Sequence, residues 1–199
     1  DDFDEQAGAD KTPFCGGCHD PAVLFKGELA DVQPDDPAAH AGVTCGTCHS
    51  MTKATLDGNG SYTIEPSMLR GPKNDSKIAI EKHRTAMSTD KVETDKLCVS
   101  CHRGFIDHRT GHAAMVLGLD EWGPHRRSGW GGNPSTRIDA PVEQRSCVDC
   151  HMPADSSGHP SHRFPGGHTT FAAMLGADDQ LAAQRELLRG AARLDVAAV

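Results

Sequence analysis

The placement of the cysteines constrains this 199-residue chain more than any other feature. All eight cysteines fall into four Cys-x-x-Cys pairs of identical spacing: Cys15/Cys18, Cys45/Cys48, Cys98/Cys101 and Cys147/Cys150. The second cysteine of every pair is followed by a histidine: His19, His49, His102 and His151. No cysteine is left over, so these four pentapeptides account for all the thiols of the chain.

The pentapeptide Cys-x-x-Cys-His is typical of a c-type haem attachment site. Two thiols at this spacing can add to the two vinyl groups of one porphyrin, and the next residue then presents its imidazole to the iron. Zinc sites, disulfides of an exported chain or a thioredoxin-like redox pair would also use Cys-x-x-Cys. None of these alternatives requires a histidine after each pair. The sequence therefore predicts four covalently bound haem c groups, with the four motif histidines as proximal iron ligands.

The composition agrees with a cofactor-filled interior. Only 37% of the residues are hydrophobic and 5% are aromatic, whereas glycine numbers 21 and histidine 12. A chain of this length normally buries a sizeable side-chain core. Large planar cofactors would fill the space that these side chains leave.

The charge and hydropathy of the chain exclude two classes of partner. Its formal net charge is −8, whereas a nucleic-acid-binding surface needs a basic stripe. The sequence has no run of 18 apolar residues, so we expect no transmembrane span. The expected partners are redox proteins or extracellular electron acceptors. Self-assembly, or a downstream domain of the same protein, is a further expectation.

Local patterns predict a mostly α-helical fold with extensive irregular loops, organised around four stacked haems and containing little β-structure. Helices are expected from Asn74 or Asp75 to about Ser88, from Thr94 or Asp95 through the third motif, at 111–119, and at 179–189 with Gly190 as the stop. Residues 61–64 are expected to form a short strand after the turn at 57–60.

Three segments are expected along the chain. Residues 1–12 form an acidic tail, residues 13–176 form the tetrahaem domain, and residues 177–199 contain a helix followed by a strand-like tail. Residues 193–196 alternate polar and apolar side chains as a strand does. Such a strand needs a sheet to join, so the tail either begins a further domain or contacts another subunit.

Four irons with six ligands each need four distal ligands in addition to the motif histidines. Eight histidines lie outside the motifs. The preferred distal candidates are His40, His83, His112 and His168, and His125 and His162 are reserves. The last two, His108 and His159, are expected to be loop residues or contacts of the haem propionates. Methionine is the alternative ligand, and it would raise the reduction potential. The surplus of histidine predicts mostly bis-histidine haems of low potential.

Taken together, the four motifs, the segment His40-Ala41-Gly42-Val43-Thr44-Cys45 and the histidine-rich stretch 150–168 resemble the multihaem c-type cytochrome superfamily. Over residues 13–172 the chain looks like the tetrahaem group related to the cytochromes of ammonia oxidisers and the extracellular cytochromes of metal reducers. The resemblance implies a chain of closely stacked haems that conducts electrons. Some relatives polymerise into conductive filaments.

The resulting expectation is electron transfer in anaerobic or extracellular respiration, not enzymatic catalysis. The alternatives are a reductase of nitrite, hydroxylamine or a sulfur compound with one five-coordinate haem, and the haem module of a larger redox protein or filament. A Cys-x-x-Cys-Lys variant, which marks the catalytic haem of one such reductase family, is missing from the sequence. Haem is attached to such motifs outside the cytoplasmic membrane, so we expect a periplasmic, cell-surface or extracellular protein.

Overall fold

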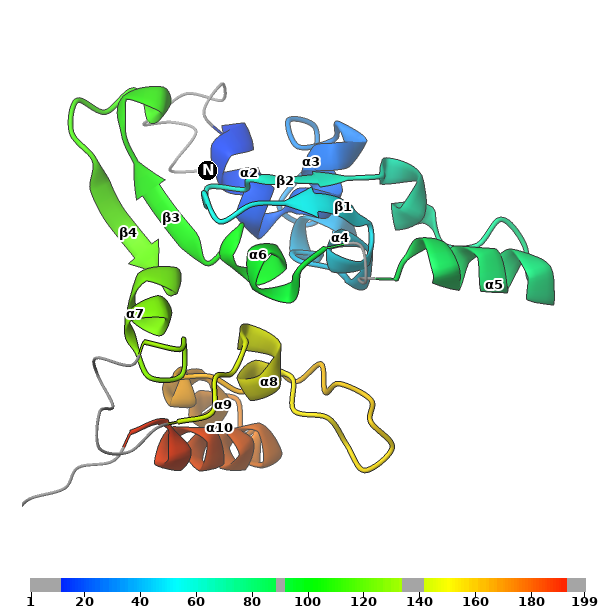
Figure 1. Ribbon diagram of the computed structural model, residues 1–199. Coiled ribbons are helices and arrows are strands. Elements are labelled where there is room, and N and C mark those ends of the chain that lie inside the picture. Colours follow the sequence, from blue (N-terminus) through cyan, green and yellow to red (C-terminus); the bar gives the residue numbers. More distant parts are fainter. Residues whose placement is uncertain (1–11, 89–91, 134–141, 193–199) are drawn as a thin grey trace, which may run out of the picture. The chain divides into compact units, whose positions relative to one another are not determined.

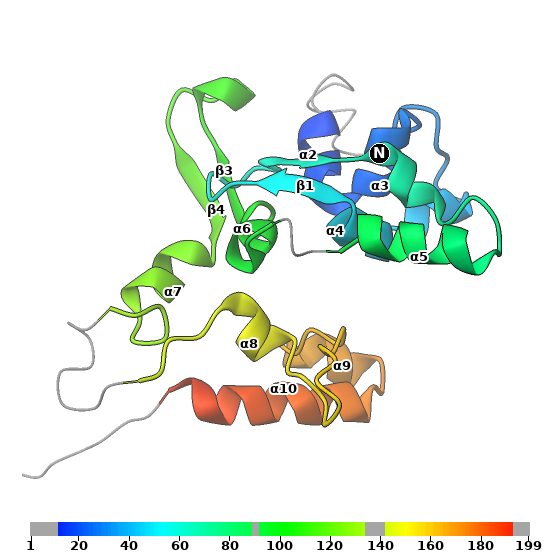
Figure 2. The same cartoon turned by 45° about the vertical axis from the view of Figure 1, so that its right-hand side comes forward.

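The computed structural model describes residues 12–88, 92–133 and 142–192 (Figures 1 and 2). The chain divides into two compact units, residues 1–128 and residues 129–199. Residues 1–11 of the expected acidic tail and the strand-like segment 193–196 lie outside the described residues. Helices predominate in both units, and the described strands form two sheets of two strands each.

A small hairpin stands at the centre of the first unit (Figure 1). Strand β2 (Tyr62–Ile64) confirms the strand predicted at 61–64, and it pairs antiparallel with β1 (Met51–Ala54), which the sequence did not predict. The turn at 57–60 is tight because Gly58, Asn59 and Gly60 all have positive φ, a conformation that suits glycine and asparagine. The hydrophobic core packs on this hairpin and contains Met51, Ala54, Ile64 and Val92, with Phe25, Tyr62, Leu69 and Leu97 against it.

Short helices surround the hairpin. They are α2 (Thr12–His19), α3 (Pro21–Lys26), η1 (Pro37–His40), α4 (Cys45–His49), η2 (Pro66–Arg70), α5 (Lys77–Ala86) and α6 (Thr94–Val99). The cap of helix α5 lies one or two residues later than Asn74 or Asp75, because the Ser76 hydroxyl accepts the capping hydrogen bond from the Ala79 amide. Helix α6 starts where predicted but ends at Val99, so Cys101 and His102 follow in a turn.

A second hairpin corrects one of the sequence predictions. Strand β3 (Arg103–Ile106) pairs antiparallel with β4 (Val116–Asp120), so the helix predicted at 111–119 is wrong. Gly111 has φ of 82° and terminates the 3₁₀ helix η4 (His108–Thr110). After Gly111 the chain pairs with the edge of β3, and this long-range backbone pairing outweighs the helical spacing of the apolar residues at 111–119. Helix α7 (Trp122–Arg127) completes this unit.

The second unit contains α8 (Cys147–His151), α9 (Thr169–Met174) and α10 (Asp178–Ala191). Helices α9 and α10 lie side by side as a helical hairpin in both views (Figures 1 and 2). Helix α10 runs through Gly190, so the predicted stop at that residue is wrong; an exposed glycine near a helix end costs only about 1 kcal/mol. None of the helices in the described residues is long and apolar enough to cross a membrane.

Few side chains are buried in either unit. Nine hydrophobic residues are buried in the described part of the chain, and Ala172 is the one that belongs to the second unit. Large apolar side chains such as Ile78, Phe171 and Leu175 are 63–82% exposed. The polypeptide alone therefore supplies a thin core.

Candidate haem centres

Each of the four motifs lies on a helical turn. Helix α2 contains the first motif, α4 and α8 coincide with the second and fourth, and the third spans the end of α6. In a helix, positions i, i+3 and i+4 share one face, so both thiols and the imidazole of a motif can address one planar cofactor. The hydroxyls of Thr44 and Ser146 cap α4 and α8 at the residue before the first cysteine. The start of these two motifs is therefore fixed locally.

Two motif imidazoles are oriented by backbone carbonyls. The Nδ1 atom of His49 lies 3.0 Å from the carbonyl oxygen of Met87. The Nδ1 atom of His151 lies 2.6 Å from the carbonyl oxygen of Pro165. A carbonyl oxygen only accepts hydrogen bonds, so Nδ1 carries the proton in both rings. The lone pair of each ring then lies on Nε2, which is the usual tautomer of a metal-binding histidine.

The motifs of α2 and α6 meet at the tip of the β1–β2 hairpin. The Gly60 amide donates to the Ser100 carbonyl oxygen at 2.8 Å. Gly60 also packs on Gly17, and a Cβ atom built on Gly60 would lie 3.7 Å from the Gly17 Cα. The thiols of Cys18 and Cys101 consequently lie within hydrogen-bonding reach of each other.

The electrostatics of these thiols follow from the same contacts. The hydrogen bond to Cys101 raises the pKa of the Cys18 thiol, and burial raises it further. The same hydrogen bond lowers the pKa of Cys101. Burial raises the pKa of the Cys48 thiol, and the neighbouring thiols of Cys98 and Cys45 add to that rise. The thiols of the first three motifs therefore influence one another.

The thiol of Cys150 in the fourth motif is not part of this group of interacting thiols. The sequence predicts that Cys150 and Cys147 together hold a haem. Both cysteines are half-buried on α8. The structure brings His151 to the Pro165 carbonyl oxygen, but it gives the Cys150 thiol no hydrogen bond or ion pair among the described residues. The contacts of the protein therefore do not mark Cys150 as a site residue. Its assignment depends on the motif spacing alone and stays a prediction.

Tyr62 lies among the thiols of the first unit. Its hydroxyl donates a hydrogen bond to the Gly17 carbonyl oxygen at 2.5 Å. Burial raises the pKa of this hydroxyl, and the thiols of Cys101, Cys18 and Cys48 contribute to that rise. The hydroxyl is therefore protonated at neutral pH. One side chain of β2 thus contacts the backbone of the first motif and is influenced electrostatically by thiols of all three motifs of the first unit.

A hollow of about 500 Å³ adjoins the second motif. It is lined by His49, His83, Arg84, Met87 and Ser88. His49 and His83 are both half-buried. The structure therefore brings a predicted proximal ligand and a predicted distal ligand to one space.

The other distal candidates lie in different surroundings. His40 is the exposed last residue of η1. His112 is exposed, and its Nδ1 atom lies 2.5 Å from the Ala114 carbonyl oxygen. His168 precedes α9 with its ring 5.9 Å from that of Phe171. Of the reserves, His125 is half-buried and stacks on Trp122 at 5.9 Å, and His162 lies edge-on to Phe164 at 6.1 Å.

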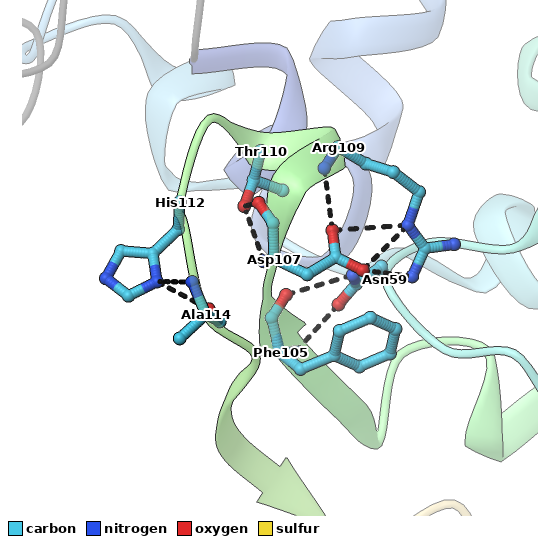
Figure 3. A network of polar contacts seen from close by, with 7 residues as sticks. All are labelled: Asn59, Phe105, Asp107, Arg109, Thr110, His112 and Ala114. Atoms are coloured by element: carbon cyan, nitrogen blue, oxygen red, sulfur yellow. Dashed lines mark hydrogen bonds and ion pairs between the residues drawn. The ribbon is translucent and has the colours of Figure 1, made fainter.

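Figure 3 shows that the His112 ring takes no part in the pairing of Asp107 with Arg109, although the His112 backbone amide donates to the Asp107 carbonyl oxygen. The Asp107 carboxylate faces the Arg109 guanidinium at 2.8 Å, and the His112 ring points toward Ala114 instead. From the turn of the β1–β2 hairpin, the Asn59 side chain donates to the Phe105 carbonyl oxygen of β3 and accepts from the Phe105 amide, at 2.9 and 2.8 Å (Figure 3). Asn59 thus covers the outer edge of β3 as a neighbouring strand would.

The residues of the motifs fit a covalently attached haem. Haem iron needs only axial ligands from the protein, whereas a structural zinc ion needs four. Among the described residues, no group of three or more His, Cys, Asp or Glu side chains is arranged as a metal site. No disulfide joins the eight cysteines, all of which lie in the described residues. Paired thiols followed by an imidazole are the donor set that haem c uses, and backbone carbonyls orient the imidazoles of His49 and His151.

Sequence reasoning missed the two carbonyls that orient the motif rings and the position of Tyr62. Every residue has a backbone carbonyl, so the sequence cannot show that those of Met87 and Pro165 orient the motif histidines. Only the fold brings them to the rings. Tyr62 did offer a signal, because it is the single tyrosine of the chain.

Comparison with known proteins adds no relative, because no protein-family model, curated protein or solved structure matches this chain.

Proposed function

We propose that this chain is a multihaem c-type cytochrome that transfers electrons through four covalently bound haem c groups. The observation that carries the proposal is the orientation of the motif rings. In two of the four motif histidines, His49 and His151, a backbone carbonyl accepts the Nδ1 proton, so Nε2 carries the lone pair that would bind the iron. This arrangement has no function in a disulfide or a thioredoxin-like pair.

The residues that would hold the four groups follow from the motifs. Each haem would form thioether bonds with one cysteine pair and take the following histidine as its proximal ligand. When bound, haem supplies a one-electron Fe(III)/Fe(II) couple. Distal histidines from the predicted set would keep these couples at low potential, since bis-histidine ligation lacks the methionine that raises it.

The grouping of thiols at the β1–β2 hairpin supports electron transfer between centres. Tyr62 and Gly60 of this hairpin bond to the backbone of the first motif at Gly17 and of the third at Ser100, so these two attachment points are close together. Centres held this way would exchange electrons with one another without a mobile carrier. A redox protein or an extracellular acceptor is the partner that fits such a conduit.

Arginines near the motifs are mostly engaged by protein groups. Arg109 pairs with Asp107 at 2.8 Å, and Arg103 pairs with Asp120 at 3.7 Å and donates to the Leu56 carbonyl oxygen. Arg84 differs because it lines the hollow beside His49. A guanidinium there would pair well with a haem propionate.

Export of the chain belongs to the same proposal. Haem c is attached outside the cytoplasmic membrane, so the mature protein would reside in the periplasm, at the cell surface or outside the cell. Fractionation of cells that produce the chain with haem should find it there. Haem-loaded chain confined to the cytoplasm would contradict this part.

The decisive test combines haem quantification with low-temperature EPR of the oxidised protein. We expect four haems per chain by the pyridine haemochrome assay and only low-spin signals. Replacing Cys45 and Cys48 by alanine should lower the content to three and serves as the calibration control. A wild-type chain with bound zinc and no haem would overturn the proposal. Four haems with one in four high-spin would favour a reductase, because an open iron position could bind a substrate.

The same assay tests the assignment of Cys150, which no protein contact supports. Replacing Cys147 and Cys150 by alanine should also lower the content to three haems per chain. If this variant keeps the haem content of the wild type, the fourth motif is not an attachment site.

A further inference from the structure

The C-terminal turn of α5 both orients His49 and carries a second histidine. The Met87 carbonyl oxygen accepts the His49 Nδ1 proton at 3.0 Å. The Met87 amide in turn donates to the His83 carbonyl oxygen at 2.9 Å. His83 therefore lies one helical turn before the residue that fixes His49, about 6 Å along the helix axis.

The rings of His49 and His83 face a shared space. Both line the hollow of about 500 Å³, and both are half-buried. Because the Met87 carbonyl oxygen contacts Nδ1 of His49, an iron bound by this ring would be coordinated through Nε2. Cys45 and Cys48, which would hold the porphyrin, belong to the same short helix α4 as His49. A cofactor tethered there is therefore adjacent to this hollow.

Helix α5 also lacks the packing that would stabilise it. It has ten residues, and none of them is buried. A helix this short is marginal in water without tertiary contacts. Its Ile78 side chain is 70% exposed. A bond from His83 to a fixed metal centre would anchor the helix where protein contacts do not.

We propose that His83 is the second axial ligand of the iron whose first ligand is His49, which makes the haem on Cys45 and Cys48 bis-histidine coordinated. This pairing rests on the proposed function. It assigns one specific distal residue to one motif, although the two histidines are 34 residues apart in sequence.

The test is the spin state and reduction potential of the haem-loaded protein after His83→Ala and His83→Met. In the alanine variant one haem of four should become high-spin, or change its potential if another side chain replaces His83. In the methionine variant all four haems should stay low-spin, and one potential should rise. The methionine variant retains a ligand, so it keeps the test decisive if the alanine variant folds poorly.

Lys82→Ala is the matched control. Lys82 is the neighbour of His83 on α5, but it lines a different hollow together with Ile78, Glu81, Thr85 and Ala86. Its removal should leave the spin states and the potentials as they are in the wild type. A change in this control equal to that of His83→Ala would mean that α5 was disturbed as a whole, and the pairing would be rejected.

A variant that lacks the second haem shows which iron His83 binds. In the Cys45→Ala/Cys48→Ala chain the second haem is missing, so adding His83→Ala should produce no new high-spin signal. A new signal there would assign His83 to a different iron. If the wild type holds four haems and both His83 variants match it in spin state and potential, the pairing fails while the proposed function stands. If the wild type holds no haem, the proposed function itself fails.

Discussion

Gly58, at the tip of the β1–β2 hairpin, is required by both its conformation and its neighbours. Its φ is 75°, and a Cβ atom there would overlap the Arg103 carbonyl oxygen. Gly58→Ala should therefore lower the free energy of unfolding by about 3 kcal/mol, from left-handed strain and from a backbone clash. Chemical denaturation followed by haem absorbance measures this loss.

Gly27→Ala separates the two causes. Gly27 has nearly the same φ, 77°, but nothing lies within 4 Å of its Cβ position. Its replacement should cost only about 1 kcal/mol, which is the conformational strain alone. Equal losses of stability at the two glycines would show that the overlap with the Arg103 carbonyl oxygen adds nothing to the cost of Gly58→Ala.

Asp107 gives the second hairpin an acid-sensitive contact. The hydrogen bond from the Arg109 side chain lowers the pKa of the Asp107 carboxyl, and the Arg109 backbone amide adds to this effect. A carboxyl with a lowered folded-state pKa stabilises the fold above its unfolded-state pKa, about 3.9. That stabilisation is lost as the pH falls through the folded-state pKa. Solvent screening keeps the contribution small, because the Arg109 side chain is 59% exposed.

We therefore expect Asp107→Asn to be less stable than the wild type at pH 7 and to approach it at pH 3. Urea denaturation at the two pH values measures the difference. Arg109→Gln should remove the same pH dependence, because it removes the hydrogen-bond donor that causes the pKa shift. A gap between wild type and Asp107→Asn that is undiminished at pH 3 would count against this account.

Among the helices and strands, the sequence correctly predicted those whose position is determined by local capping and turn residues. Ser76 and Asn74 stand at the start of α5, and the turn at 57–60 precedes β2, so both elements were found within two residues. The helix predicted at 111–119 failed because the pairing of β4 with β3 is a long-range contact that no local spacing records. The same limit applies to the site. The motifs are visible in sequence, but the carbonyls of Met87 and Pro165 become visible only in the fold.

The contact between α2 and the third motif predicts which centres are neighbours. Cys18 and Cys101 lie within hydrogen-bonding reach, and Gly60 and Tyr62 hold their backbones in place independently of the thiol protons. After attachment the two thioether sulfurs should remain close. We therefore expect the first and third haems to be direct neighbours, although the second motif lies between them in sequence.

EPR of the oxidised protein can detect this neighbourhood through magnetic coupling between the irons. Replacing Cys98 and Cys101 by alanine removes the third haem, so a newly uncoupled low-spin signal should arise from the first. The pair Cys45→Ala/Cys48→Ala, which removes the second haem, is the comparison and should leave the coupling of the first and third intact. Loss of that coupling in the comparison variant would favour an arrangement in sequence order.

For the whole molecule, the decisive property is how little the polypeptide buries by itself. The second unit has one buried hydrophobic residue among those described, Ala172, while Phe171, Met174 and Leu175 are 63–82% exposed. Such a unit cannot offset the conformational entropy of folding with side-chain burial alone. If haem c is bound there, its binding free energy must contribute to folding, as metal binding does in small metal-dependent domains.

Removal of the fourth attachment site should therefore unfold the second unit while the first keeps its structure. In Cys147→Ala/Cys150→Ala, amide hydrogen exchange should become fast in α8, α9 and α10. The hairpin β1–β2 should keep its protection, because its core of Met51, Ala54, Ile64 and Val92 belongs to the other compact unit. The matched variant Cys45→Ala/Cys48→Ala should give the reverse pattern, with protection lost around α4 and α5. Undiminished protection of α9 and α10 without the fourth haem would mean that their own contacts suffice, and that the cofactor contributes redox chemistry but not stability.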